Sequence, residues 1–352
     1  MIGAKGIEGV SFSFAAGVAL AAVLGFRPEP EGTMCLVLSC AVLGALICSE
    51  PDSALPYLAL FFVAGAFCLA AGQLPHRVAN PFSAQFDGLC RRIDLLPFGN
   101  PLTGKLSKAL LCGEKSDLDP FVRNAFRDSG ASHILALSGM HLGLIYGLVS
   151  NLLRILGNGL RQRRARAAVT IASCGWYTVM TGAGPSVLRA FIFICLNEIS
   201  RLSPDRRKSA SKIYCSALLI QLCIDPSGIR IVSFQLSWLA MCGITLIFPR
   251  MKDWLPVGRR KFSLTGRIWN CIALSVSCQL FTAPLVWWKF GSFPVYFLLS
   301  NLIALPLSEG LMLCSLGCLA ADCAGIRATL LPSLADKLCN CLIFSLETIS
   351  SM

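Results

Sequence analysis

Two histidines and a serine stand close together at the start of a long apolar run, in the stretch His133-Ile-Leu-Ala-Leu-Ser-Gly-Met-His141. Imidazole and hydroxyl groups can transfer protons, bind a metal or hydrogen-bond a polar substrate. Polar groups are costly in hydrocarbon, so those inside apolar runs usually line a cavity or pack against other helices. His133, Ser138 and His141 are therefore the first candidates for a functional site.

Two kinds of chemistry fit these residue types, and the spacing argues against both. Ser138 and His141 suggest an intramembrane hydrolase, but the sequence has no GxSxG elbow and no evident acidic partner. On an unbroken helix His133 and His141 lie about 80° apart, whereas metal-binding pairs prefer an i, i+4 spacing. No CxxC pair is present either. We expect no catalytic residue, no metal and no other cofactor, and keep the hydrolase as an alternative.

An acidic stretch precedes this run. We expect Ser116 or Asp117 to cap a short helix over 117–129, which has Pro120 in its first turn. A divalent-cation site formed by Glu114, Asp117 and Asp119 is the alternative.

Later apolar runs are interrupted by polar side chains, prolines and glycines. The polar residues are candidates for the lining of a path: Arg189, Gln235, Ser237, Gln279 and Asn301. Three glycines recur every fourth residue and predict a close helix contact: Gly139, Gly143 and Gly147. Three prolines are expected to kink or end helices: Pro185, Pro284 and Pro306. Broken helices with polar side chains are typical of a transport path.

The elements that carry these residues must lie in a membrane. The chain of 352 residues is 55% hydrophobic and only 14% charged, with a mean hydropathy of +0.66. Its apolar runs have about the length that spans a bilayer. We predict an all-α polytopic membrane protein with roughly 10–11 transmembrane helices, some broken by Gly or Pro. A helix is expected from 131 to 156, and another is expected to end at Pro306.

Charge gives the topology. The net charge is +12, and about half of the 31 Lys and Arg fall in three loops near 161–166, 201–212 and 250–267. Two apolar segments separate each successive pair, which places all three loops on one side, expected to be the cytoplasm. The N-terminus is then cytoplasmic too. We divide the chain into N-terminal helices (1–74), an extracytoplasmic segment (75–130) and a transmembrane domain (131–352).

The extracytoplasmic segment contains an amphipathic pattern. Apolar residues over 82–96 fall on one helix face, which predicts a helix lying on the membrane or, alternatively, docked under an extramembrane lid. Cys90 and Cys112 lie in the same segment, and the sequence leaves open whether they are bridged.

Four stretches in order resemble the ComEC/Rec2 family of competence proteins: GEKS…FRDSGASHILALSGMHLGL (113–144), GPSVLRAFIF (184–193), DPSGIRIVSFQLSWLAMCGI (225–244) and SCQLFTAPLVWWKFGSFPVYFLLSNLIALPL (277–307). The resemblance implies an inner-membrane channel that carries single-stranded transforming DNA into the cytoplasm. It assigns no position a chemical role and marks these as signature positions: His133, Ser138, Gly139, His141, Pro185, Arg189, Phe234, Gln235, Ser237, Gln279, Pro284, Asn301 and Pro306. Long family members carry a metallo-β-lactamase-like domain, whose HxHxDH run is missing here, so we expect a separate nuclease.

The channel interpretation implies further partners. No energy-coupling motif is present, so we expect a cytoplasmic ATPase or strand-binding protein to drive import, besides membrane lipid and a homo-oligomeric state. The main alternative is a secondary transporter of a small anionic solute, for which Glu309 is the candidate coupling carboxylate.

Overall fold

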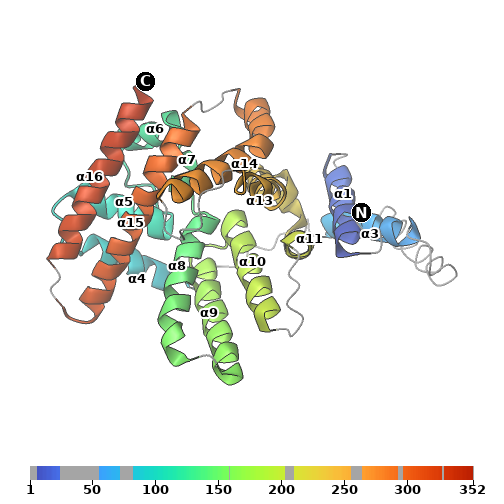
Figure 1. The fold of residues 1–352 in the computed structure, drawn as a ribbon, viewed down its shortest axis with the longest axis horizontal. Helices are drawn as coiled ribbons and strands as arrows, with labels where there is room; N and C mark the ends of the chain where they lie inside the picture. The colour runs from blue at the N-terminus through green and yellow to red at the C-terminus, as the bar shows by residue number, and fades with distance from the viewer. Residues whose placement is uncertain are drawn as a thin grey trace.

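The computed structural model describes residues 6–23, 55–71, 82–157, 159–202, 210–254, 264–291, 296–326 and 329–351. Every regular element in these ranges is a helix (Figure 1). They are α1 (Ile7–Val23), α3 (Leu55–Ala71), α4 (Ser83–Asp94), α5 (Pro101–Cys112), α6 (Pro120–Asp128), α7 (Ser132–Leu135), α8 (Gly139–Leu152), η1 (Leu153–Leu156), α9 (Leu160–Met180), α10 (Pro185–Leu202), α11 (Ala210–Ile224), η2 (Pro226–Arg230), α12 (Val232–Leu246), α13 (Phe248–Met251), α14 (Leu264–Phe290), α15 (Phe297–Cys323) and α16 (Leu330–Ser350). A further helix expected at 34–49 lies outside the described residues.

Three helical stretches in the described part of the chain are long and apolar enough to cross a bilayer. They are Val232–Met251, which joins α12 to α13, Ile268–Phe290 in α14, and the whole of α15. These stretches confirm the predicted helical membrane protein. The larger number of spans stays a prediction, because other apolar helices such as α1 and α11 are shorter.

The two prolines inside the long helices do not end them. α14 continues through Pro284 and α15 continues through Pro306, so the predicted end at Pro306 is wrong. A proline removes one helical hydrogen bond, but packing against neighbouring helices can hold a transmembrane helix together across it. α15 packs along α16 as a hairpin (Figure 1), and this contact supplies that support.

Glycines allow two pairs of helices to approach closely. A Cβ on Gly17 of α1 would lie 1.8 Å from the Phe62 carbonyl oxygen of α3. A Cβ on Gly243 of α12 would lie 2.0 Å from the Ser277 carbonyl oxygen of α14. Neither position has room for a side chain, so these glycines fix the distance between the helices of each pair.

The segment from α4 to α7 packs on the α15–α16 hairpin. α4 is amphipathic as predicted, and its apolar residues, among them Leu89 and Ile93, pack in a core shared with α5, α6, α15 and α16. Its place on the membrane or under a lid stays a prediction. Cys90 and Cys112 in this segment are both free thiols. The cap of α6 is Asp119, whose carboxylate accepts from the Phe121 N–H at 2.8 Å. The predicted cap, Ser116 or Asp117, is wrong because both residues take part in a different network, described below.

Polar contacts fix this docking. Asp336 of α16 accepts hydrogen bonds from the Gly99 N–H at 2.8 Å, from the Thr103 hydroxyl at 2.6 Å and from the Asn100 N–H at 3.3 Å. The buried hydroxyls of Ser107 in α5 and Ser315 in α15 lie 2.8 Å apart. The extracytoplasmic assignment of 75–130 stays a prediction, and the described part of it is attached along the hairpin.

Candidate functional site

The signature stretch breaks at its serine. α7 ends at Leu135, the backbone is extended at Ala136 and Ser138, and α8 begins at Gly139. The predicted continuous helix over 131–156 is therefore wrong. The break is stable because the Ser138 hydroxyl accepts from the Met140 N–H at 3.2 Å and the His141 Nδ1 accepts from the Ser138 N–H at 3.1 Å. These are the two halves of a capping box, with histidine in the place usual for Glu or Gln.

The Ser138–His141 pair also has the spacing of a nucleophile and a base. The hydroxyl oxygen lies 3.0 Å from His141 Nδ1. That nitrogen already accepts the Ser138 N–H, and the hydroxyl already accepts the Met140 N–H. Both groups are therefore engaged in starting α8, and the geometry is that of a helix cap.

Four predicted positions bury a polar atom that has no hydrogen-bond partner among the described residues. The atoms are His141 Nε2, Arg189 Nη1, Gln279 Nε2 and Asn301 Oδ1, and they come from α8, α10, α14 and α15; Ser11 Oγ in α1 is another such atom. A buried polar group without a partner costs about 1–3 kcal/mol. Such a set on predicted positions points to water or a polar ligand in the interior.

His141 contributes a donor to this set. Its Nδ1 accepts from a backbone N–H, so the proton of the neutral imidazole is assigned to Nε2. The side chain is 0% exposed. Three of the four unpaired atoms, those of His141, Arg189 and Gln279, are therefore donors, and donors suit an anionic ligand.

Arg189 lies against the start of α8. It is 8% exposed, and its Nη2 stands 3.4 Å from the place that a Cβ on Gly139 would take. No carboxylate pairs with it in the described part of the chain; Glu198, on the same helix, binds Arg201 at 2.7 Å and the Tyr146 hydroxyl at 2.6 Å. The start of a helix carries partial positive charge. A buried cation and a helix N-terminus thus meet without a counterion.

The other predicted path residues have partners or are exposed. Gln235 donates to the Ile229 carbonyl at 2.7 Å, and Ser237 lies 3.2 Å from the Ser186 hydroxyl. His133 is exposed on α7 and approaches Asn301, with no hydrogen bond of good geometry between them.

Among the predicted prolines and glycines, some have packing contacts and others face open space in the described chain. Pro185 is the first residue of α10, and its carbonyl accepts from the Gln221 side chain at 2.9 Å. Gly139 packs tightly on α10, since a Cβ on this glycine would lie 3.1 Å from the Ala190 Cβ. Nothing in the described chain lies within 4 Å of the corresponding place on Gly143 or Gly147. A helix contact at those two glycines stays a prediction.

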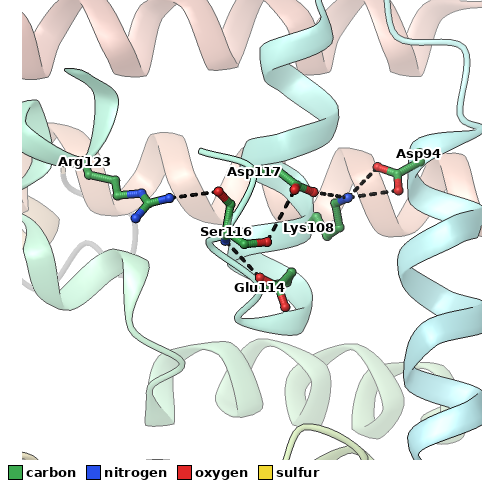
Figure 2. A network of polar contacts seen from close by, with 6 residues as sticks. All are labelled: Asp94, Lys108, Glu114, Ser116, Asp117 and Arg123. Carbon is green, nitrogen blue, oxygen red and sulfur yellow. Dashed lines mark hydrogen bonds and ion pairs between the residues drawn. The ribbon is translucent and has the colours of Figure 1, made fainter. Parts of the chain in front are cut away.

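A charged network lies beside the break. The buried ammonium of Lys108 in α5 binds Asp94 of α4 at 2.8 Å and Asp117 at 2.7 Å (Figure 2). Glu114 accepts from the Ser116 N–H at 2.9 Å, and Arg123 donates to the Ser116 carbonyl at 2.9 Å. The acids considered as a cation site therefore point to different partners. Among the described residues, no group of three His, Cys, Asp or Glu is placed to hold a metal.

The network fixes the protonation of its members. Burial alone would lower the pKa of Lys108, but hydrogen bonds and charges from Asp117 and Asp94 outweigh it and raise that pKa above its usual value. The hydrogen bond from Lys108, aided by its charge, lowers the pKa of the Asp117 carboxyl. The hydrogen bonds from Ser116 lower the pKa of Glu114. All of these groups are charged at neutral pH, and the loop between α5 and α6 is held in one place.

Three residues that matter to this arrangement were missed by the sequence analysis: Lys108, Lys115 and Asp336. Lys108 and Asp336 join segments far apart in the sequence, and no local motif marks such contacts. Lys115 lines a pocket of about 380 Å³ next to the break. Lys115 stands next to Glu114 in the GEKS stretch, and alternating charges of this kind are typical of a solvated loop.

The part of the chain that contains the signature residues is similar to known proteins. A family model described as "Competence protein" matches residues 110–352. The chain is 26% identical over 237 residues to "ComE operon protein 3" of Bacillus subtilis (strain 168), which covers 65% of this chain and 28% of that protein. It is 27% identical over 206 residues to "Competence protein ComA" of Neisseria gonorrhoeae, which covers 57% of this chain and 28% of that protein.

The matched region is thus only part of these relatives, since the chain spans little more than a quarter of their length. No solved structure matches the chain. The family match runs from the end of α5 to the last residue and includes the break, Arg189 and all four unpaired positions. On this match the chain belongs to the ComEC/Rec2 family of competence proteins.

Proposed function

We propose that this chain forms an inner-membrane channel that imports single-stranded DNA during natural competence. The observation that carries the proposal is the unpaired set, in which His141, Arg189 and Gln279 offer buried donors with no acceptor among the described residues. One relative is named a competence protein, and so is the matching family model. A strand of DNA brings one phosphate acceptor per nucleotide, which is the chemistry that this set lacks.

The positions of the donors suit a path rather than a tight binding site. His141 and Arg189 lie at the starts of α8 and α10, and Gln279 lies in the middle of α14. Positive groups spread along a path lower the cost of moving a phosphate chain through a low-dielectric region. A small-solute transporter coupled through Glu309 fits less well, because Glu309 is exposed on α15 while Arg189 is buried.

We infer the membrane orientation from the basic helix ends. Arg163 at the start of α9 donates to the carbonyl of Arg201 at the end of α10, at 3.1 Å, so two of the three basic regions meet. We place this end in the cytoplasm, which puts the N-terminus there as well and the break between α7 and α8 at the outer side. In this scheme the strand meets the break first.

The proposal includes partners that act on the strand. A cytoplasmic ATPase or strand-binding protein would pull the strand, and a separate nuclease would degrade its complement. A homo-oligomer is part of the proposal too, and Gly143 and Gly147, which have open space beside them in the described chain, are the positions we assign to that contact.

Photocrosslinking during transformation tests the proposal. Benzoylphenylalanine at Gln279 would face the path, whereas the same residue at Phe344, which is 70% exposed on α16, would face away from it. We expect labelled donor DNA to crosslink from position 279 and not from 344, and the captured DNA to be sensitive to a single-strand nuclease. Equal crosslinking from both positions, or capture of duplex, would overturn the proposal.

A further inference from the structure

A pocket beside the helix break is walled by four separate parts of the chain. Its volume is about 380 Å³, within the range of about 300–1,000 Å³ typical of small-ligand sites. The lining comes from α4, the α5–α6 loop, the break before α8 and the end of α9: Phe86, Cys112, Gly113, Lys115, Ala136, Leu137, Met180, Thr181 and Gly182. Two parts of its lining thus directly precede α8 and α10 in the sequence, the helices that hold two of the unpaired donors, His141 and Arg189.

The walls of this pocket are fixed by close contacts. Gly113 ends α5 with a φ of 79°, and a Cβ there would lie 2.5 Å from Leu137 Cδ1. The Tyr177 hydroxyl of α9 donates to the Leu111 carbonyl of α5 at 2.7 Å. The Lys108 network holds the rest of the α5–α6 loop (Figure 2). The pocket is thus formed by side chains and loops that are tied down on three sides.

Lys115 is the one charged residue that lines the pocket. Its acidic neighbours are engaged elsewhere, since Glu114 accepts from Ser116 and Asp117 binds Lys108 (Figure 2). No ion pair involves Lys115 in the described part of the chain. The side chain is half-buried, and burial, with the charge of Arg123, lowers its pKa. An ammonium held in this way favours an anion.

The remaining lining indicates which anion. Phe86 offers an aromatic ring, on which a base of any sequence can stack. The Thr181 hydroxyl donates to backbone carbonyls of α9 and keeps lone pairs that can accept. Leu137 and Met180 are apolar. One cation beside an aromatic ring and an apolar wall suits a phosphodiester that carries a base.

We propose that this pocket is an outer subsite that binds one nucleotide of single-stranded DNA, with its phosphate on Lys115. The inference rests on the proposed function for the identity of the strand. The nucleotide would wait beside the break, one step before the phosphate chain reaches Arg189. Nothing in the signature stretches alone singled out this pocket, because Phe86 lies outside them and Lys115 is one residue of a charged loop.

Binding to the purified full-length chain tests the subsite. The probe is a fluorescein-labelled oligothymidylate of about 12 nucleotides, within single-strand site sizes, followed by anisotropy over a range of salt concentrations. We expect Lys115→Gln to weaken binding roughly tenfold and to reduce the slope of log K against log salt by about 0.7, the value for one phosphate contact. Lys105→Gln is the matched control, since Lys105 is exposed on the same segment and outside the pocket.

A second variant tests the space instead of the charge. Ala136→Trp fills the pocket from its exposed, extended position before α8, and should weaken binding without a change in net charge. A methylphosphonate strand, which has no backbone charge, should bind wild type and Lys115→Gln equally. Monodispersity and thermal melting of each variant exclude misfolding as the cause.

The outcomes separate this inference from the proposed function. If the wild type binds the strand and Lys115→Gln keeps the same affinity and salt slope, the subsite is overturned while the channel stands. If the wild type binds no strand, both lose their support. If phosphatidylglycerol displaces the strand from wild type only, and lipid copurifying with wild type is missing from Lys115→Gln, the pocket binds a lipid headgroup and the subsite is overturned.

Discussion

The Lys108 network should respond unequally to the removal of its cation and of its anions. The Lys108 side chain is 8% exposed, whereas those of Asp94 and Asp117 are 49% and 48% exposed. In Lys108→Met the two half-exposed carboxylates can be hydrated, and the loss is limited to hydrogen bonds to a charged group, about 1.5–3 kcal/mol. In Asp94→Asn/Asp117→Asn the ammonium stays buried without a counterion, and such a charge costs about 3–5 kcal/mol.

Hydrogen exchange measured by mass spectrometry over the α5–α6 loop gives the two losses directly. Each 1.4 kcal/mol of local stability corresponds to about a tenfold change in protection, so protection should fall by roughly 10² to 4 × 10³-fold in the double variant and by roughly 10–10²-fold in Lys108→Met. Peptides of α9 distant from the loop serve as internal controls. Equal losses, or a larger loss in Lys108→Met, would refute the reasoning that burial of the ammonium dominates this network.

Three further predictions concern the frame around the site. Asp336→Ala removes the acceptor of Gly99 and Thr103 and should lower the free energy of opening at residues 99–103, measured by hydrogen exchange, by about 1–2 kcal/mol. Asp336→Asn should keep part of the protection, and unchanged exchange would contradict the docking role. Gly243→Ala meets the Ser277 carbonyl and should lower the melting temperature in detergent. Gly88→Ala, on an exposed part of α4 with nothing within 4 Å in the described chain, should be neutral or stabilising by up to about 1 kcal/mol; the reverse order would refute the close α12–α14 contact. Because the pKa of Asp117 is lowered, its contribution to stability is present above the unfolded value near 3.9 and is lost as pH falls further. Because the pKa of Lys108 is raised, its contribution to stability persists until pH rises beyond about 10.4. Protection of the loop, corrected for intrinsic exchange, should therefore be constant from about pH 5 to 9, and a midpoint inside that range would be inconsistent with the network.

The helical class and most helix positions could be predicted from the sequence, because apolar runs and turn residues are local signals. The failures have physical causes that are not local. Pro306 was expected to end a helix, but contact with α16 holds α15 together on both sides of it. Ser138 was expected inside a helix, because a capping box is recognised in a sequence by Glu or Gln at its third helical position, and that position here is His141.

The candidate site could be predicted as a set of residue types but not as a geometry. Arg189 and His141 stand out as polar groups in apolar runs, and both are buried without a full set of partners. The sequence could not show that Gln235 and Ser237 have partners, because the partner of Gln235 is the Ile229 carbonyl of η2 and that of Ser237 is the Ser186 hydroxyl of α10. Lys115 could not be separated from Lys108 either, since only the fold shows that one is neutralised by two carboxylates and the other is not.

The central claim is that buried donors around Arg189 carry single-stranded DNA inward, and transformation of a strain deleted for this gene tests it most directly. Donor DNA is measured separately outside the inner membrane and in the cytoplasm, after complementation with wild type, Arg189→Gln or Arg164→Gln, the last being an exposed arginine with the same change in charge. We predict that the deletion leaves DNA outside, that wild type and Arg164→Gln restore import, and that Arg189→Gln, present at the same level, does not. Normal import in the deletion strain, or full rescue by Arg189→Gln, would contradict the claim.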